Sequence, residues 1–532
     1  MAPSSSPLQP AQTGQTPRVT RPTAKRVRAA LAWTAGAAAL FALYLRIKVS
    51  MAPDSDTANN ALQAWDMLHG HLLLHGWLTG DVPFYTFELP LMAIVEIFFG
   101  LHNVAMHVSM ALVYLIITGC AVAIAVTDSR GAARAARTGV TVAVLAAPVL
   151  TVTEAWIPLG FPDHFGTAVF LLVPCLLIDR ASSRRFTAPL LCVILVAGQI
   201  GDVTVRYVAV PAIIVTCAYQ VLAARRIKTG DAANLLAAAL SLPLATAVRD
   251  LMRHLGSYLM TAPKTGIAPV SEWAYNRALT WHSVRMLFGI TGEPGSAPVG
   301  KTAIFGWACL AVAVAGMLRV IWRWRRARRS EQVLLLAIVA NVIVYALSTL
   351  PTPVDPHDIA GLLPAGAILG ARALVPDRIS GRLTALVATC AALIAALLPL
   401  SLQAAARSPQ VTPVADLTAW LQAHGLRYGL GGYWDSSVVS LQSGGQVLVR
   451  AVGNHEGQIR PDAWETNFLW YDPARHYANF VIFNVSGNDL GTRALRFFGT
   501  PVSVSRVGAW DVAIYDTNVL QRVGAPVLPP TS

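Results

Sequence analysis

The chain has 532 residues, of which 55% are hydrophobic and only 13% are charged. This composition is too apolar for a soluble globular protein, so it indicates a polytopic membrane protein. The formal net charge is +13, but the Lys and Arg residues fall in short clusters between apolar segments, which is typical of cytoplasmic loops and argues against nucleic-acid binding.

The first segment, residues 1–28, is rich in Ser, Pro, Gln and Thr and becomes basic near its end. This composition predicts a disordered cytoplasmic tail. Residues 29–45 form the first apolar segment, and no A-x-A cleavage site follows it, so we expect an uncleaved membrane span. Arg46 and Lys48 are expected to extend toward the outer interface of the bilayer.

Acidic residues are concentrated directly after this span, at the start of an outer loop predicted over residues 50–102. Asp54, Asp56 and Asp66 lie there in a chain that has few charges. Acids held against the face of a bilayer are costly to desolvate, so they usually mark a cavity that binds a polar group or performs chemistry. The alternative is that Asp54 and Asp56 cap a helix and that all three side chains are solvated.

Two helices are expected within this outer loop. Apolar residues recur at helical spacing over residues 57–74, which predicts a helix lying in the membrane interface. The apolar segment 84–100 is short, contains Glu88 and Glu96 and begins near prolines, so we expect a re-entrant or juxtamembrane helix. In the alternative topology this region crosses the membrane twice, and the next arginine-rich loop lies outside.

Loops with several arginines are expected to be cytoplasmic under the positive-inside rule. With this constraint, the apolar segments predict a mainly α-helical plasma-membrane protein with about eleven spans, its N-terminus inside and its C-terminus outside. The membrane domain is expected over residues 29–404, with outer loops at 50–102 and 249–300. The spans are expected at residues 29–45, 104–126, 140–156, 165–178, 188–201, 207–222, 232–248, 302–320, 331–349, 360–373 and 384–402.

The other outward-facing loops hold further candidate binding residues, which are Asp163, His164, Asp202, Arg206, Arg249, Arg285 and His357. Asp163 follows a proline at a helix start, where it is either a cap or a cavity residue. Asp202 and Arg206 are spaced i, i+4, so they form either an ion pair or part of a site. Arg285 lies in a second interfacial helix predicted over residues 271–290. His357 belongs either to a polar loop or to a donor site.

The composition changes after residue 404, because long apolar stretches stop and Gly, Asp and Asn become frequent. Residues 405–522 are expected to form a small extracytoplasmic α/β domain, followed by a disordered tail at 523–532. The pattern predicts a helix, then strands, and finally a hairpin. The helix is expected at 414–424, a strand followed by a Gly-rich turn at 428–434, strands at 446–452 and 480–484, and the hairpin at 502–515.

Several features stand in a recognisable order along the chain. A first span delivers acids to the outer face, and it is followed by the Asp-bearing helix AWDMLHG, a proline-bearing apolar segment ending in FFG, and a PDH turn. This order resembles the GT-C superfamily of integral-membrane glycosyltransferases, in particular its protein O-mannosyltransferase and aminoarabinose-transferase branches. The segments PDSD, DHFGT and GLRYGLGGYWD are also similar to segments of uncharacterised actinobacterial membrane proteins.

The resemblance implies a polyprenyl-phosphate-linked sugar as donor, a glycan, lipid or protein as acceptor, and an Asp of the first outer loop as base. Such a transfer needs a carboxylate to take the acceptor's proton and cations to stabilise the departing phosphate. Asp54 or Asp56 would be the base, with Asp66 and Glu88 near the substrate. The arginines named above would bind the phosphate. The D-x-D spacing of Asp54 and Asp56 can also hold a divalent cation, Mg²⁺ or Mn²⁺.

Two other functions fit the same residues. In a lipid or solute transporter or flippase, the acids would couple ions or bind headgroups, but no internal repeat is visible and the acids cluster at one face. In a degenerate GT-C protein, the fold would serve as a scaffold without catalysis. The clustering of acids favours the enzyme.

Overall fold

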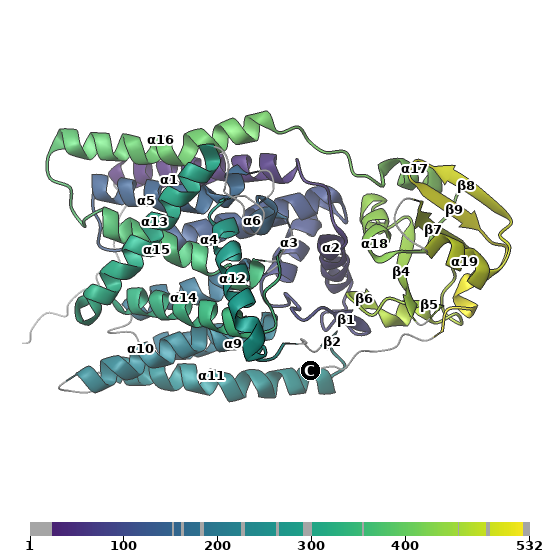
Figure 1. Cartoon of the computed structure of the whole chain (residues 1–532), viewed down its shortest axis with the longest axis horizontal. Coiled ribbons are helices and arrows are strands. Elements are labelled where there is room, and N and C mark those ends of the chain that lie inside the picture. Colours follow the sequence, from purple (N-terminus) through teal and green to yellow (C-terminus); the bar gives the residue numbers. More distant parts are fainter. Residues whose placement is uncertain are drawn as a thin grey trace, which may run out of the picture.

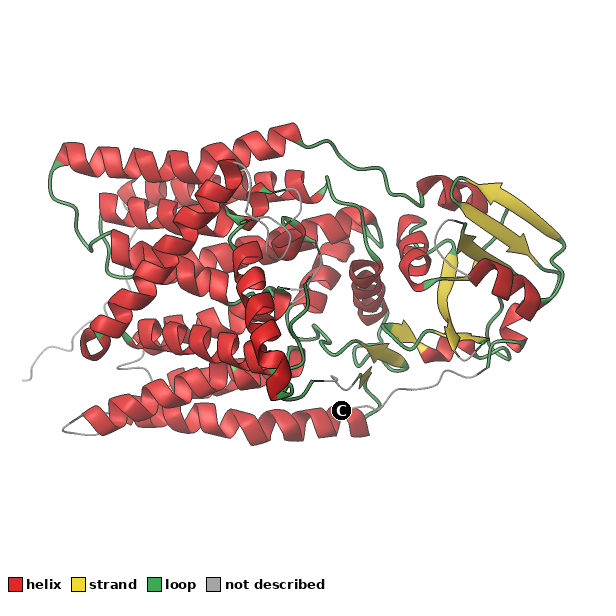
Figure 2. Cartoon of the chain, viewed as in Figure 1, coloured by secondary structure: helices red, strands yellow, loops and turns green. Residues whose placement is uncertain are grey.

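The computed structural model describes residues 24–151, 154–160, 164–180, 186–224, 229–261, 265–290, 301–353, 356–455, 457–485 and 490–524. A bundle of helices forms one end of an elongated molecule, and a small domain that contains a β-sheet forms the other (Figure 1). Figure 2 shows that the strands lie only in this domain and at its junction with the bundle. The prediction of a mainly helical protein with a C-terminal α/β domain is confirmed.

Seven helical segments within the described residues are long and apolar enough to cross a membrane, so the chain is a multi-pass membrane protein. Four shorter helices complete the bundle, and each of the eleven predicted spans overlaps one of these eleven segments. The long segments are α1 (Ala24–Lys48), α4 (Asn103–Ala125), Thr204–Ala223 with α9 (Thr204–Tyr207) and α10 (Ala209–Ala223), α11 (Thr229–His254), α13 (Lys301–Trp322), α14 (Arg329–Leu347) and α16 (Arg382–Ala406). The shorter helices are α5 (Ala132–Ala146), α7 (Val169–Arg180), α8 (Thr187–Gly201) and α15 (Leu362–Leu374).

The boundary predicted for the third span is wrong. The sequence predicts a span at 140–156, whereas α5 begins at Ala132 and ends at Ala146. Pro148 follows after Ala147, and because proline has no N–H, it cannot donate the hydrogen bond that would continue the α-helix at this position. A single 3-10 turn follows instead, over Pro148–Leu150.

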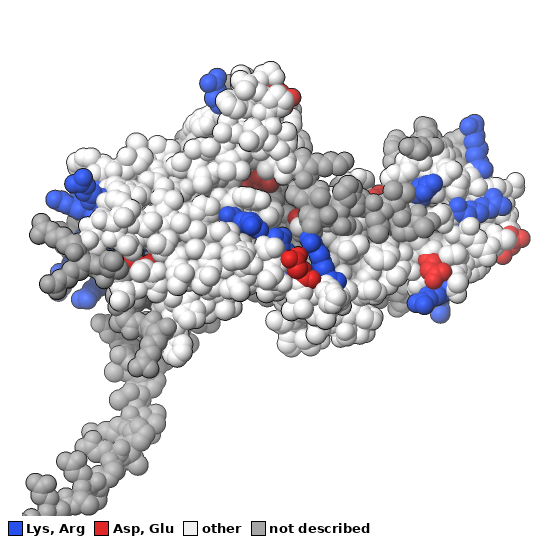
Figure 3. Space-filling model, turned by 90° about the horizontal axis from the view of Figure 1, so that it is seen from below, with Lys and Arg blue, Asp and Glu red and all other residues white. Residues whose placement is uncertain are grey.

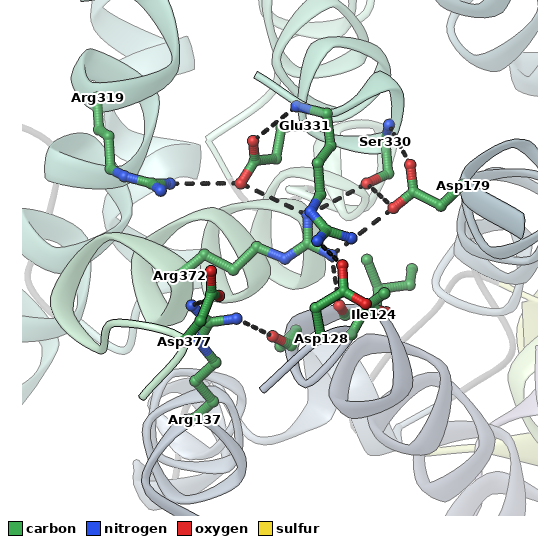
Figure 4. A network of polar contacts seen from close by, with 12 residues as sticks. Ile124, Asp128, Arg137, Asp179, Arg319, Ser330, Glu331, Arg372 and Asp377 are labelled. Atoms are coloured by element: carbon green, nitrogen blue, oxygen red, sulfur yellow. Dashed lines mark hydrogen bonds and ion pairs between the residues drawn. The ribbon is translucent and has the colours of Figure 1, made fainter. Parts of the chain in front are cut away.

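A network of buried charges holds together the end of the bundle that lies away from the C-terminal domain (Figure 4). Arg372 on α15 is 3% exposed. Its guanidinium donates to the carbonyl oxygen of Ile124 at 2.6 Å and to Ser330 Oγ at 3.2 Å, and it lies 3.5 Å from Glu331 Oε1 and 3.8 Å from Asp179 Oδ2. These contacts join α4, α7, α14 and α15 in one place. Burial of so many charges is tolerated because each faces an opposite charge or a hydrogen-bond partner.

Helices α2 (Ser55–Leu68) and α3 (Glu88–Phe99) lie between the bundle and the C-terminal domain (Figure 1). The interfacial placement predicted for residues 57–74 is wrong, because α2 is buried over Ser55–Ala64, including the polar residues Asn59, Asn60 and Gln63. Its polar stripe packs against α18 (Tyr433–Gln442) of the C-terminal domain. The amphipathic pattern therefore arises because α2 packs against other helices of the protein on both sides, with α18 on its polar side.

A three-stranded sheet links three distant parts of the chain at this junction. Its order is β2-β1-β6, with β1 (Trp77–Thr79) parallel to β2 (Leu259–Met260) and antiparallel to β6 (Thr466–Asn467). The first predicted outer loop, the second one and the C-terminal domain are therefore hydrogen-bonded together. This sheet fixes the domain against the bundle.

The C-terminal domain is built on a six-stranded sheet of order β5-β4-β3-β7-β9-β8. The three central strands are parallel and the outer ones antiparallel, with helices α17 to α19 beside them. The predicted helix at 414–424 and the predicted hairpin are confirmed by α17 and by β8 with β9. The elements are α17 (Ala415–Ala423), β3 (Tyr428–Gly431), β4 (Leu448–His455), β5 (Gln458–Pro461), β7 (Phe480–Asn484), α19 (Leu490–Phe498), β8 (Ser503–Val507) and β9 (Trp510–Ile514).

Within the predicted strand and Gly-rich turn at 428–434, the strand β3 ends at Gly431 and Tyr433 already begins α18. Gly429 and Gly431 belong to the strand itself. A Cβ at either position would overlap the side chains of Phe480 and Ile482 on the neighbouring strand. The glycines therefore permit close packing of β3 and β7.

Candidate active site

The segment 160–167, which contains the PDH turn, is contacted by several of the candidate residues. The carbonyl oxygen of Gly160 accepts hydrogen bonds from Lys48 Nζ and from Thr57 Oγ1, the latter at 3.4 Å. Lys48 is fully buried, so the prediction that it extends toward the interface is wrong. The end of α1 is instead attached to the turn through this lysine.

Asp54 caps α2 and lies next to the same attachment. Its Oδ1 accepts from the Thr57 amide at 2.7 Å and from Thr57 Oγ1 at 2.8 Å. The sequence left a helix cap and a cavity residue as alternatives for Asp54. In the structure, Asp54 both caps α2 and lies half-buried beside the turn. Thr57 Oγ1 lies between the carboxylate of Asp54 and the carbonyl oxygen of Gly160, and its single proton serves one of the two acceptors at a time.

Asp56 faces the C-terminal domain. Tyr433 donates its hydroxyl to Asp56 Oδ1, and the same hydroxyl lies 3.3 Å from Glu465 Oε2 and 3.4 Å from Asn59 Nδ2. Burial raises the pKa of Tyr433, and the negative charges of Glu465 and Asp56 raise it further. The phenol is therefore neutral and remains a hydrogen-bond donor to the carboxylate.

His164 lies between two carboxylates. Its Nδ1 is 2.7 Å from Asp202 Oδ2, and its Nε2 is 3.3 Å from Asp358 Oδ1. A ring nitrogen meets an ionised carboxylate through an N–H, so two such contacts together require the imidazolium form. The backbone of His164 has φ of 34°, an unfavourable conformation for a residue other than glycine, and such strain is concentrated at functional sites.

Asp202 is 2% exposed, and it holds the His164 ring from the side that faces the protein interior. Burial alone would raise the pKa of Asp202, but the charge of His164 and the hydrogen bonds from His164, Thr167 and the Thr204 amide hold it at about 2. The ion pair predicted between Asp202 and Arg206 does not form, since Arg206 instead donates to Thr246 Oγ1 at 3.4 Å. Helical spacing suggested the wrong partner because α8 ends at Gly201 and a turn intervenes.

A cavity of about 460 Å³ opens beside this histidine. Most of its wall is apolar, and its ionisable lining residues in the described chain are Asp81, His164, Asp358 and two tyrosines, Tyr207 and Tyr345. A mainly apolar cavity with a few convergent polar groups is the usual form of a ligand site. Asp54 and Asp56 are not among its lining residues. Asp54 adjoins Thr57, which contacts Gly160, whereas Asp56 is directed to Tyr433.

Glu88 also reaches this segment. It is 3% exposed, and its carboxylate lies against Gly166, where a Cβ would overlap Oε1. Asp163, which the sequence places in the same turn, lies outside the described residues. Glu88 of α3 and Thr57 of α2, which also binds Asp54, thus contact the segment that contains His164 from two different helices.

Three arginines lie close together where α9 meets α11, namely Arg206, Arg249 and Arg253. Arg206 lies next to Thr246 of α11, and the charges of Arg206 and Arg253 both act on Arg249. The acid closest to them is Asp250, whose Oδ1 lies 3.6 Å from Arg253 Nη1. Figure 3 shows basic side chains near the middle of the face that α11 forms. Three neighbouring guanidinium groups with one such acid form a surface that attracts an anion.

The two remaining candidates, Arg285 and His357, lie in different places. Arg285 is buried on α12 (Trp273–Leu287), with Nη2 3.2 Å from His282 Nδ1. His357 is buried with its ring against Trp156, at 4.7 Å between centroids. Neither residue lines the cavity of about 460 Å³, but His357 lines a smaller adjoining pocket together with His164 and Asp358.

Asp66 holds the loop after α2. Its oxygens are 2.6 Å from His71 Nδ1 and 2.8 Å from Trp77 Nε1. The sequence left solvation or substrate binding open for Asp66. In the structure, its carboxylate instead binds two residues of the segment that follows α2.

Two residues of the site, Asp81 and Tyr433, were not predicted as site residues, whereas Asp358 stands beside His357 in a segment for which a donor site was one alternative. Asp81 and Asp358 line the cavity, and Tyr433 donates to Asp56. The repeated acids around Asp358 and the GYWD segment around Tyr433 were visible signals. No signal singled out Asp81. Among the described residues, no three His, Cys, Asp or Glu side chains form a metal-binding group.

Solved structures of other proteins show which fold the chain has. No protein-family model matches the chain, and no curated protein matches it. The crystal structure of ArnT from Cupriavidus metallidurans bound to undecaprenyl phosphate matches with a TM-score of 0.56 and 12% identity, over 94% of this chain and 99% of that one. The chain has an ArnT-like fold. The apo structure of ArnT matches with a TM-score of 0.54 and 13% identity, over 93% and 99%. The GT-C-type fold implied by the order of the motifs is thus confirmed.

Proposed function

We propose that the protein is a membrane glycosyltransferase that moves a sugar from a polyprenyl-phosphate-linked donor to an acceptor on the extracytoplasmic side of the plasma membrane. The observation that carries the proposal is a carboxylate-lined cavity, beside a strained His164, in a chain with an ArnT-like fold over 94% of its length. The ArnT structure with bound undecaprenyl phosphate supports a lipid phosphate of this class.

In the proposed reaction, the carboxylates and the arginines have separate roles. An oxygen of the acceptor attacks the anomeric carbon of the sugar, the bond from that carbon to the phosphate oxygen breaks, and polyprenyl phosphate leaves. A carboxylate takes the acceptor's proton, and cations stabilise the phosphate. The arginine group of Arg206, Arg249 and Arg253 suits the phosphate, because guanidinium groups bind its oxygens in pairs.

Asp54 is the better placed of the two proposed bases. Its carboxylate adjoins the turn that leads to the cavity, whereas Asp56 is directed to Tyr433 and the C-terminal domain. Asp358, held by His164, would bind hydroxyl groups of the sugar in the cavity. Asp54 is engaged by Thr57 and Asp56 by Tyr433, so the two carboxylates do not converge on one divalent cation, and adding a chelator to the assay is expected to leave transfer unchanged.

The test is transfer of radiolabelled sugars from a panel of polyprenyl-phosphate donors, with membranes that contain the wild type or a variant. Asp54→Asn keeps the cap to Thr57 but removes the base, so transfer is expected to fall by at least about 100-fold while the protein remains in the membrane. Asp56→Asn can still accept from Tyr433 and is expected to lose less. Asp472→Asn, at an exposed position of the C-terminal domain, is the matched control.

Two outcomes would overturn parts of the proposal. Full activity of both single variants and of the double variant would remove the first-loop aspartates as bases. Absence of transfer from every donor by folded wild-type protein would remove the enzyme itself.

A further inference from the structure

A second large cavity lies far from the candidate active site, among α1, α4, α5 and α16. Its volume is about 500 Å³, and its walls are formed mainly by Ala, Val, Leu and Gly. Helices α1 and α5 each pack against both α4 and α16, so the cavity is a groove enclosed by four membrane-spanning helices. Figure 1 shows these helices together at the top of the bundle.

Two glycines keep the groove open. A Cβ at Gly36 of α1 or at Gly119 of α4 would meet no atom within 4 Å. At Gly139 of α5, in contrast, a Cβ would overlap Ala392 of α16. The α5–α16 wall is thus in tight contact, while the α1–α4 wall borders empty space within the span.

One end of the groove is positively charged. Arg134 is its only charged lining residue in the described chain, and it is exposed. Its guanidinium makes no hydrogen bond or ion pair to the described residues. The neighbouring Arg137 differs, because it donates to the carbonyl oxygen of Val375 and to Asp377 Oδ1. Figure 3 shows further basic side chains at this end of the bundle.

We propose that this groove binds one acyl chain of an anionic glycerophospholipid of the bilayer, with the lipid phosphate at Arg134. An apolar groove inside a membrane-spanning bundle suits a hydrocarbon chain, and an uncompensated arginine at its end suits a phosphate. Basic pockets between transmembrane helices on the cytoplasmic side are known to bind anionic headgroups. The positive-inside rule puts the Arg134 end on that side.

The site is separate from the proposed transfer reaction. Lys48 marks the end of α1 that joins the active-site turn, whereas Arg134 lies at the opposite end of the bundle, beside the network of Arg137 and Asp377. A lipid here would fill the space between α1 and α5. It would therefore stabilise the position of α1 against the bundle.

The test measures lipid binding by the full-length protein in detergent. Native mass spectrometry and thermal unfolding are recorded with phosphatidylglycerol and with phosphatidylcholine of identical acyl chains. We expect about fivefold tighter retention of phosphatidylglycerol, as one arginine near an anionic headgroup predicts. We also expect a higher unfolding temperature with that lipid, because a ligand that binds only the folded state stabilises it.

Variants separate the headgroup from the chain. Arg134→Gln is expected to abolish the preference for phosphatidylglycerol, and Gly119→Leu is expected to fill the groove and abolish retention of either lipid. Gly36→Leu fills the same space from α1 and serves if the first filling variant does not fold. Arg382→Gln, an exposed arginine at the start of α16 that does not line the groove, is the charge-matched control and should behave as the wild type.

The proposal would be wrong if both lipids were retained equally by the wild type, or if Arg134→Gln kept the preference. Undiminished retention in both filling variants would place the lipid elsewhere.

Discussion

The contacts of His164 show how single residues acquire a role that spacing along the chain does not reveal. This histidine, which belongs to the DHFGT segment, is held by Asp202 on one nitrogen and by Asp358 on the other. The two acids are 38 and 194 residues away along the chain, as the numbering in the sequence gives. Asp202 is buried and Asp358 lines the cavity, so the histidine transmits a fixed orientation from the protein interior to the ligand site.

Asp202 is expected to be the main anchor of this arrangement. Asp202→Asn leaves the imidazolium of His164 with one carboxylate and should destabilise the protein by about 3–5 kcal/mol. The pKa of Asp202 in the folded protein is about 2, below the usual value of about 3.9. Its stabilising effect is therefore present above pH ~4 and lost as the pH falls through about 2.

Thermal unfolding in detergent at pH 7 measures this difference. Asp358→Asn is the comparison, because the side chain of Asp358 is 19% exposed and its loss should have a smaller effect. An unfolding temperature of Asp202→Asn equal to that of the wild type would contradict the anchoring role.

At the scale of elements, α2 shows what a sequence pattern can and cannot predict. Its existence and start at the PDSD segment follow from the helical spacing and from the capping aspartate. Its surroundings do not, because the polar face that suggested a membrane interface packs against α18, where Ser437 Oγ donates to Asn59 and Ser55 Oγ to the carbonyl oxygen of Tyr433. A partner helix almost 380 residues away along the chain produces no periodic pattern in the sequence of α2, so it could not be predicted from that sequence.

The buried charge network at the other end of the bundle is expected to fix four helices against each other. Arg372→Met removes the central guanidinium and leaves Asp179 and Glu331 with fewer partners, so it should destabilise the protein by about 3–5 kcal/mol. Arg323→Met, at an exposed position on the end of α13, is the control. Thermal unfolding of the two variants in detergent checks the expectation, and equal unfolding temperatures would contradict it.

At the scale of the whole molecule, hydropathy predicted the bundle well, because a membrane span must be long and apolar wherever it packs. The candidate site was predicted only in parts. The structure brings the candidates His164, Asp202, Glu88 and His357 into one region, where their roles stay predictions, whereas Arg285 lies on α12 and Asp81 was not among the candidates. Polar residues in loops are brought together by tertiary packing, so their pairing could not be read from one chain.

The orientation of the molecule is a further prediction. The positive-inside rule puts the arginine-rich end of the bundle in the cytoplasm and the C-terminal domain outside. In a variant without the six native cysteines, Asp472→Cys should react with a membrane-impermeant maleimide in intact cells, whereas Arg323→Cys should react only after permeabilisation. Labelling of Arg323→Cys alone in intact cells would reverse the topology.

The central claim is that acids at the junction of bundle and C-terminal domain perform a transfer reaction on a lipid-linked sugar. The most direct measurement is the initial rate of label transfer from a polyprenyl-phosphate sugar, compared between the wild type and Asp54→Asn at equal amounts of folded protein. The account predicts measurable transfer by the wild type and a loss of at least about 100-fold in the variant. Equal rates in the two proteins would contradict it.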